Sequence, residues 1–265
     1  MKTLLITGDD IRHRYAANKL HEKRILAAIV AEKKASPTSH LDSKHPQDKI
    51  HRHFAERLEV EDKLLGPNEF PNDVPLLSVE NGDSSTPKVV DWVNSQQPDL
   101  ILLYGSSVIR GALLTYYESR IINVHLGLSP YYRGSGTNFW PLVHRIPECV
   151  GATIHLATPQ VDAGNIIWQV RPEGIVGTDR AHELGTKTII TVFSHLSTIL
   201  NSYFLGEIIP KKQDVSIGTL CRRRDFTNEA VNTLWENLTN TMIPNYLTEK
   251  RVRDEKYPIV SLLNH

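Results

Sequence analysis

Short, continuously apolar runs constrain the fold of this chain more than any other feature. Residues 3–7 and, apart from Asp99, residues 98–104 are such runs, each followed by a glycine, and residues 24–31 form another after Arg24. Apolar runs without alternation are typical of parallel strands that are buried on both faces. A helical pattern over about residues 12–22 follows the first run. This order of strand, glycine turn and helix predicts an α/β fold with a Rossmann-like, doubly wound, mostly parallel sheet.

Further segments extend this pattern along the 265 residues. Thr86 before Pro87 predicts the start of a helix. We expect other helices at about residues 47–60, 178–205 and 227–251, an edge strand at 74–79, and strands at 151–157, 165–170 and 257–260. The chain is long enough for one large domain with a small appendage. We therefore expect a main domain over residues 1–205 and a C-terminal extension of short strands and helix over residues 206–265.

Composition narrows the class of function. Lys plus Arg and Asp plus Glu each number 30, and this zero net charge argues against a general nucleic-acid binder. No apolar run approaches the roughly 20 residues of a membrane-spanning helix. The two cysteines, Cys149 and Cys221, form no disulfide or metal framework, so we expect a reduced, cytoplasmic protein. His51 and His53 lack helical metal-ligand spacing, and we expect no metal site.

Polar side chains interrupt the apolar pattern at residues 121–125, Ile-Ile-Asn-Val-His. Asn123 and His125 lie two positions apart, so on a strand they point to the same face. At the end of the strand they would face the crevice where open α/β sheets bind ligands. Asp162 precedes Ala-Gly after the next strand, in a turn that can present a carboxylate.

An Asn, a His and an Asp at this crevice suit acyl chemistry. His moves protons near neutral pH or donates to an oxyanion, and Asn adds an uncharged donor. Asp orients the His or accepts the proton of an attacking amine. The alternative is structural: Asn123 caps a turn, His125 is a satisfied buried histidine, and Asp162 begins a loop. Residue types and spacing alone leave both interpretations open.

Other polar residues are candidates for substrate binding. Arg14 lies on the first helix, where it could reach an anionic ligand or simply face solvent. Tyr132 and Arg133 follow the strand that ends at His125 and could stack on or pair with a substrate, unless they belong to a plain surface loop. Residues 32–75 are polar and uneven, and the sequence leaves open whether they form part of a substrate pocket. The chain has no dinucleotide fingerprint, which disfavours a dehydrogenase.

The order of these residues resembles the 10-formyltetrahydrofolate-dependent formyltransferase superfamily. The sequence Asn-Val-His-Leu-Gly-Leu-Ser-Pro-Tyr-Tyr-Arg-Gly at 123–134 is followed by His155, Asp162 and Gly164, in the family's pattern. The resemblance is good over about residues 98–172 and loose elsewhere, and it is greatest to the sugar N-formyltransferases. It implies that the main domain is a formyltransferase catalytic domain.

The resemblance also implies roles for individual residues. Asn123, His125 and Asp162 would be catalytic, with Asn123 and His125 stabilising an oxyanion while Asp162 holds His125 charged and accepts the amine's proton. The sequence leaves open whether His125 or Asp162 moves the proton. The residues that would contact the pterin of the 10-formyltetrahydrofolate co-substrate form two groups, Ser107, Val108 and Ile109 in one and Ala157, Thr158 and Val161 in the other.

The acceptor follows from the resemblance by elimination. Methionyl-tRNA formyltransferases normally carry a further basic C-terminal domain, which the last 60 or so residues do not match. The glycinamide ribonucleotide enzyme has a Gly/Ser/Asn phosphate loop that residues 8–14 do not match, and the folate hydrolase usually has an extra N-terminal domain. The primary amine of an amino sugar remains, nucleotide-linked or free, as used in surface polysaccharide. The sequence leaves the oligomeric state open, a homodimer included, and a hydrolase or a binding module that lost turnover also stays open.

Overall fold

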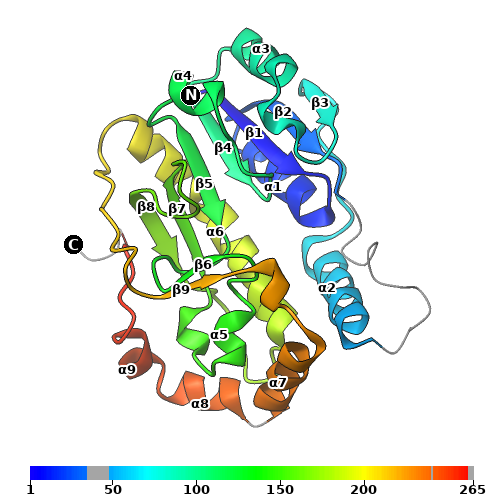
Figure 1. Cartoon of the computed structure of the whole chain (residues 1–265), viewed down its shortest axis with the longest axis vertical. Helices are drawn as coiled ribbons and strands as arrows, with labels where there is room; N and C mark the ends of the chain where they lie inside the picture. Colours follow the sequence, from blue (N-terminus) through cyan, green and yellow to red (C-terminus); the bar gives the residue numbers. More distant parts are fainter. Residues whose placement is uncertain (35–47, 240, 262–265) are drawn as a thin grey trace.

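The computed structural model describes residues 1–34, 48–239 and 241–261. A central sheet of seven strands has the order β3-β2-β1-β4-β5-β7-β8 (Figure 1). The pairs among β1 to β5 are parallel, and β7 runs antiparallel to both of its neighbours, β5 and β8. The strands are β1 (Thr3–Gly8), β2 (Leu26–Glu32), β3 (Leu76–Val79), β4 (Leu100–Tyr104), β5 (Ile121–His125), β7 (Ala152–Leu156) and β8 (Ile166–Val170). This arrangement confirms the α/β, mostly parallel fold.

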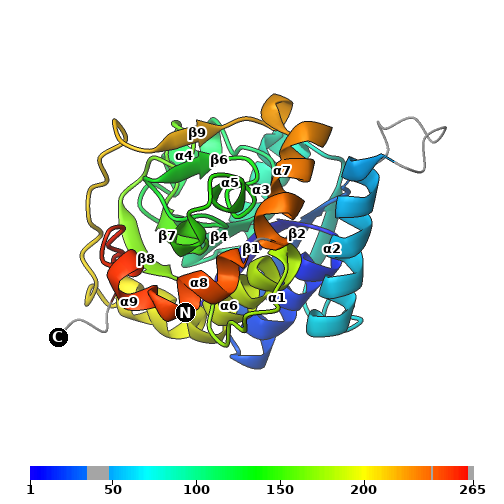
Figure 2. The same ribbon diagram turned by 90° about the horizontal axis from the view of Figure 1, so that it is seen from below.

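Helices cover both faces of this sheet (Figures 1 and 2). One face packs its alternate residues, such as Leu5 and Leu102, against α1 (Ile11–Glu22) and α6 (Ala181–Phe204). The other face, with Leu4 and Ile101, packs against α3 (Pro87–Gln96) and α4 (Ala112–Tyr116). Cover on both sides explains why these strands are apolar without alternation. Of the helices in the described ranges, none has both the length and the apolar character needed to cross a bilayer.

Helix α2 (Lys49–Leu65) lies beside α1, α6 and α7 (Asn228–Thr239). It begins after Asp48, whose side chain accepts a hydrogen bond from the Ile50 amide at 3.0 Å. It ends at Gly66, which has a φ of 75°. Residues 35–47, part of the polar stretch 32–75, lie outside the described residues. The rest of that stretch places α2 along one wall of the cavity described below.

The part of the chain after α6 differs from two expectations. The single helix expected at 227–251 is wrong: α7, α8 (Met242–Thr248) and α9 (Lys250–Asp254) replace it. Thr241 has a φ of 58°, which a right-handed helix does not accommodate. The strand expected at 257–260 is also wrong. Val260 exchanges hydrogen bonds with Gln169, but one of them uses the Gln169 side chain, so no ladder forms.

The remaining strands and helices are short. Strand β6 (Tyr132–Gly134) pairs in parallel with β9 (Thr219–Cys221), which comes from the C-terminal part of the chain. The short helices are α5 (Trp140–Val143), η1 (Asp83–Ser85), η2 (Pro147–Cys149) and η3 (Arg223–Asp225). The C-terminal part therefore packs directly on the loop that follows β5. The domain boundary at residue 205 stays a prediction.

Candidate active site

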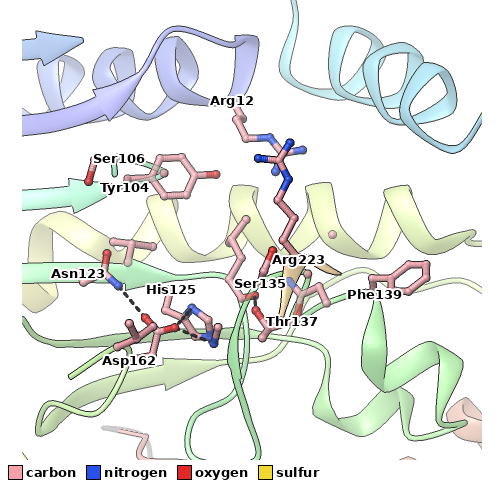
Figure 3. A pocket seen from close by; sticks show the side chains of 18 of the residues that line it. Arg12, Tyr104, Ser106, Asn123, His125, Ser135, Thr137, Phe139, Asp162 and Arg223 are labelled. Atoms are coloured by element: carbon pink, nitrogen blue, oxygen red, sulfur yellow. Dashed lines mark hydrogen bonds and ion pairs between the residues drawn. The ribbon is translucent and has the colours of Figure 1, made fainter. Parts of the chain in front are cut away.

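A cavity of about 920 Å³ lies at the carboxyl ends of β4 and β5. From β1 the chain adds β2 and β3 on one side of the sheet and then adds β4 and β5 on the other side. The boundary between β1 and β4 is therefore the point where the strand order switches direction. The crevice at such a switch point is where doubly wound folds bind ligands. The walls of the cavity come from the ends of β4 and β5, from α1, α2 and α6, and from the loops after β5 and β7 (Figure 3).

Asn123 and His125 lie on β5 and turn the same way, as their spacing predicts. The Asn123 amide nitrogen lies 3.3 Å from Asp162 Oδ1 and 3.0 Å from His155 Nε2. His125 Nδ1 lies 3.3 Å from Asp162 Oδ2. In Figure 3 dashed lines join Asp162 to Asn123 and to His125. The structure therefore brings together the three residues that the sequence singled out.

The main chain around Asp162 holds its carboxylate in this position. Asp162 has a φ of 48°, in the left-handed region, and its Oδ2 accepts the Gly134 amide proton at 2.9 Å. Gly164 leaves room for this turn, since a Cβ there would overlap the carbonyl oxygen of Leu156. The Gln213 amide donates to the carbonyl oxygens of Asp162 (3.0 Å) and Gly164 (2.5 Å). Contacts from Gly134, Leu156 and Gln213, three separate parts of the chain, therefore fix the conformation of this turn.

Burial and charge set the protonation of the pair. Burial acts to raise the pKa of Asp162, but His125, His155 and the Gly134 amide outweigh it and hold that pKa well below the usual range. Burial lowers the pKa of His125, against the opposite effect of the Asp162 carboxylate. These directions favour an ionised Asp162 and a neutral His125 at pH 7. The expectation that Asp162 keeps His125 charged stays a prediction, and burial of the ring acts against it.

The surroundings of His125 nevertheless suit a second proton on its ring. Its Nε2 lies 3.1 Å from the carbonyl oxygen of Tyr132, and its Nδ1 faces Asp162. Both neighbours are acceptors, so an imidazolium would find a partner for each N–H. The Tyr132 carbonyl and the Asp162 carboxylate would therefore stabilise the imidazolium that forms when the ring accepts a proton from a reacting amine.

Two residues of this site were not singled out as functional from the sequence. His155 is the register partner of Asn123 on β7, and its Nε2 lies 3.5 Å from Asp162 Oδ1. His155 was part of the family's sequence pattern. Its position on a strand expected to follow β5 was the signal that could have marked it as a site residue. Gln213 belongs to an irregular segment after α6, and no periodicity or motif marks it.

The loop after β4 carries one group of expected folate contacts. Ser107, Val108 and Ile109 all line the cavity. Glu32, fully buried at the end of β2, holds this loop: its carboxylate accepts from the Ser107 amide (2.8 Å) and hydroxyl and from the Ser84 hydroxyl (2.6 Å). A buried carboxylate thus fixes one wall of the cavity. No sequence motif marks Glu32 for this role.

The loop after β7 carries the second group. Ala157, Thr158 and Val161 line the cavity as well. Val108 and Val161, from the two loops, keep 50% and 44% of their surface exposed. Apolar side chains exposed in a cavity suit a flat aromatic ring such as a pterin. The residues present therefore fit the co-substrate that the resemblance implies.

The three expected substrate-binding residues are turned away from the cavity. Arg14 donates to the carbonyl oxygens of Asp9 and Asn68 at 2.9 and 3.0 Å. Tyr132 is buried, with its hydroxyl 2.9 Å from His144 Nδ1. Arg133 is buried and donates to the carbonyl oxygen of Val215 at 2.9 Å. These contacts tie loops together, and none of the three side chains lines the cavity.

Known proteins with similar sequences include methionyl-tRNA formyltransferases. The enzyme of Trichlorobacter lovleyi is 29% identical over 138 residues, which cover 49% of this chain and 41% of that protein. The enzyme of Chloroflexus aurantiacus is 29% identical over 153 residues, covering 57% and 48%. The chain thus matches less than half the length of these relatives.

Solved structures share the fold over a larger part of the chain. A sugar N-formyltransferase from a Shewanella species has a TM-score of 0.55 and 18% identity, covering 85% of this chain and 78% of its own. Glycinamide ribonucleotide transformylase 1 from Symbiobacterium toebii has a TM-score of 0.53 and 18% identity, covering 80% and 93%.

A family model places the chain among these proteins. The model described as "Formyl transferase" matches residues 3–191, which include both loops of the cavity and all of β5 and β7. The chain therefore belongs to the formyl transferase family.

Proposed function

We propose that this protein transfers the formyl group of 10-formyltetrahydrofolate to the primary amine of an amino sugar, in nucleotide-linked form. The observation that carries the proposal is the ionised Asp162 carboxylate within 3.3 Å of both the His125 imidazole and the Asn123 amide, on the floor of a cavity of about 920 Å³. A binding module has no need for a charged carboxylate held against a neutral imidazole.

In this proposal each of the three residues acts on a different atom. The Asn123 amide donates to the formyl oxygen as it gains negative charge while the amine adds. The neutral His125 ring accepts the proton of the attacking nitrogen. Asp162, 3.3 Å from Nδ1, stabilises the imidazolium that results. The imidazolium then returns a proton to the folate nitrogen that leaves.

The folate would lie between the loops after β4 and β7, with its ring against Val108 and Val161. A solved structure with a TM-score of 0.54, a sugar 3N-formyl transferase called WlaRD, was obtained with dTDP and 5-N-formyl-THF. That protein is 14% identical to this chain, so the likeness supports the fold, and the folate and sugar enter here by proposal. The free thiols of Cys149 and Cys221 fit a cytoplasmic enzyme, and formylated amino sugars of this kind serve surface polysaccharide.

A second acceptor is favoured by the sequence relatives, which are methionyl-tRNA formyltransferases. A tRNA substrate would require a basic surface, whereas the chain has 30 basic and 30 acidic residues. We therefore place methionyl-tRNA second and the glycinamide ribonucleotide third.

The test is a panel of amines with the purified protein and 10-formyltetrahydrofolate. Release of tetrahydrofolate is followed with nucleotide-linked amino sugars, free amino sugars, glycinamide ribonucleotide and methionyl-tRNA, and in their absence. Release that requires an amino sugar is the expected result. If tetrahydrofolate is released only with methionyl-tRNA, the acceptor is the tRNA and not an amino sugar. If it is released equally without any amine, the protein is a hydrolase.

A further inference from the structure

A cluster of buried charges lies in the cavity away from Asp162. Arg12 on the first turn of α1 and Arg57 in the middle of α2 both reach the same oxygen of Glu61. The Arg57 Nε lies 3.5 Å from Glu61 Oε1, and the Arg12 Nη2 lies closer still. Both arginine side chains are 18% exposed and Glu61 is 1% exposed. All three residues line the cavity.

Two guanidinium groups share the Glu61 carboxylate inside the cavity. The Asp10 carboxylate also acts on both guanidinium groups, but Asp10 does not line the cavity. On the cavity side the cluster therefore carries more positive than negative charge. Burial, together with Arg12, lowers the pKa of Arg57 to about 10, so Arg57 still carries its charge at pH 7. The Arg12 Nε and the second oxygen of Glu61, Oε2, have no hydrogen-bond partner among the described residues. The Arg57 Nε has the 3.5 Å contact with Glu61 Oε1. Buried charges and donors are costly unless they are paired, which points to an anion as the missing partner.

Tyr104 supplies an independent observation at the same place. It ends β4, is 2% exposed, and its hydroxyl has no hydrogen-bond partner within the described part of the chain. Burial raises the pKa of Tyr104, so the hydroxyl keeps its proton and can donate. In Figure 3 this hydroxyl points toward the guanidinium of Arg12. Buried hydroxyls of folded proteins usually have a partner, so an acceptor atom of a ligand is indicated here.

Arginines on the rim extend the positive lining. Arg222 and Arg223 line the cavity from the C-terminal part, and Figure 3 shows Arg12 and Arg223 reaching in from opposite walls. Among the described lining residues, four arginines thus face two carboxylates, Glu61 and Asp162. The whole chain is neutral, so this positive charge is local to the cavity.

We propose that Arg12, Arg57 and Tyr104 form a binding site for a phosphate group of the acceptor. Guanidinium groups pair well with phosphate oxygens, and the Arg12 Nε–H and the Tyr104 hydroxyl are buried donors without a partner among the described residues. The site lies close to the chemistry, since Leu103, next to Tyr104, is the register partner of Asn123. One acceptor can therefore place its phosphate here and its amine near His125. That the phosphate belongs to the acceptor rests on the proposed function; the phosphate site itself does not.

Calorimetry with the full chain and inorganic phosphate or pyrophosphate tests the site without any formyl transfer. Arg57→Gln is expected to weaken binding about tenfold or more, and Tyr104→Phe about fivefold. Arg52→Gln is the matched control, because Arg52 lies on the same helix but pairs with Glu56 outside the cavity lining. It should bind as the wild type does. Thermal melts confirm that each variant is folded.

Glu61→Gln gives a test with the opposite sign. Removal of the competing carboxylate should tighten phosphate binding, whereas a merely structural loss at this buried residue would weaken it. Equal affinities of Arg57→Gln and Arg52→Gln, weaker binding by Glu61→Gln, or no binding by the wild type at millimolar phosphate would each overturn the site.

Kinetics separate this site from the proposed function. With a nucleotide-linked or phosphorylated amino sugar, Arg57→Gln should raise the acceptor KM and leave the folate KM unchanged. With the unphosphorylated amino sugar, Arg57→Gln and the wild type should have the same acceptor KM, and a rise there would contradict the site. If the wild type and the variants bind phosphate as expected but no amine is formylated, the phosphate site is supported and the proposed function is refuted.

Discussion

Asp162 Oδ2 lies 3.3 Å from His125 Nδ1 on the cavity floor, where the His125 and Asp162 side chains are only 6% and 9% exposed. This contact joins the end of a central strand to a loop that comes 37 residues later in the sequence. It sets an ionised carboxylate against a neutral imidazole, which is the electrostatic basis of the proposed mechanism.

His125→Ala removes the proposed proton acceptor. We expect kcat to fall by roughly 10²–10³ or more, because the variant lacks the ring that accepts the proton of the amine. Binding of tetrahydrofolate, measured by calorimetry, should change little, since the expected folate contacts are on the two flanking loops. Unchanged turnover in this variant would refute the role of His125.

Asp162→Asn should lower kcat by roughly 10²–10³ and also move the pH profile. The carboxylate raises the pKa of His125 against the effect of burial, so its removal should lower that pKa further. The acid limb of the kcat profile, where His125 becomes protonated, should therefore lie below pH 6.5 in the wild type and at still lower pH in the variant. The comparison uses one acceptor for both proteins. A limb that moves to higher pH would contradict the assignment of the proton to His125.

Glu32→Gln tests the support of the loop after β4. Burial acts to raise the pKa of Glu32, but hydrogen bonds from Ser107 and Ser84 lower it overall. The charged carboxylate therefore stabilises the fold above its unfolded pKa, and this contribution is lost as the pH falls through the lower folded pKa.

For the same variant we expect a rise in the folate KM of about tenfold with a small change in kcat. Glu80→Gln is the control, since Glu80 is exposed and pairs only with Lys33 among the contacts described. If both variants raised the folate KM equally, Glu32 would have no special part in positioning the loop.

Gly134→Ala should damage both stability and turnover. Gly134 has a φ of 93°, and a Cβ there would overlap the carbonyl oxygen of Cys221 on β9. The strain should cost about 1–3 kcal/mol in the free energy of unfolding and displace the amide that donates to Asp162. Gly174→Ala is the control, because Gly174 also has a positive φ but a Cβ there would meet no atom of the described residues. Urea unfolding of both variants measures the difference, and equal losses would mean that the overlap with Cys221 is relieved without cost.

The sheet and the common direction of Asn123 and His125 could be predicted from the sequence, and the reason is local. Continuous apolar runs have one stable environment, a strand covered on both faces, and Asn123 and His125 share a face by strand geometry alone. The family pattern then supplied Asp162, which periodicity could not place. The break at Thr241 was missed because a single left-handed residue has no compositional mark when it is threonine.

The arginine-lined side of the cavity could not be predicted from the sequence. Arg14 was the expected anion contact, but it bonds to main-chain carbonyls, and Arg12 two positions earlier lines the cavity instead. Which side of a helix faces a cavity depends on how α1 and α2 pack, and that is a tertiary property. Arg57 is four positions before Glu61 on the same helix, so their contact follows from helix geometry. Arg12 is 49 positions before Glu61, so its contact with the same carboxylate depends on the tertiary fold.

The most direct measurement follows the formyl carbon itself. The purified protein is incubated with 10-formyltetrahydrofolate labelled at the formyl carbon and a nucleotide-linked amino sugar, and the products are separated and identified by mass spectrometry and NMR. The proposed reaction predicts labelled formamide on the sugar amine, formed together with tetrahydrofolate and lost in His125→Ala. Label recovered only as formate, or a sugar that stays unlabelled while the protein is folded and binds folate, would contradict it.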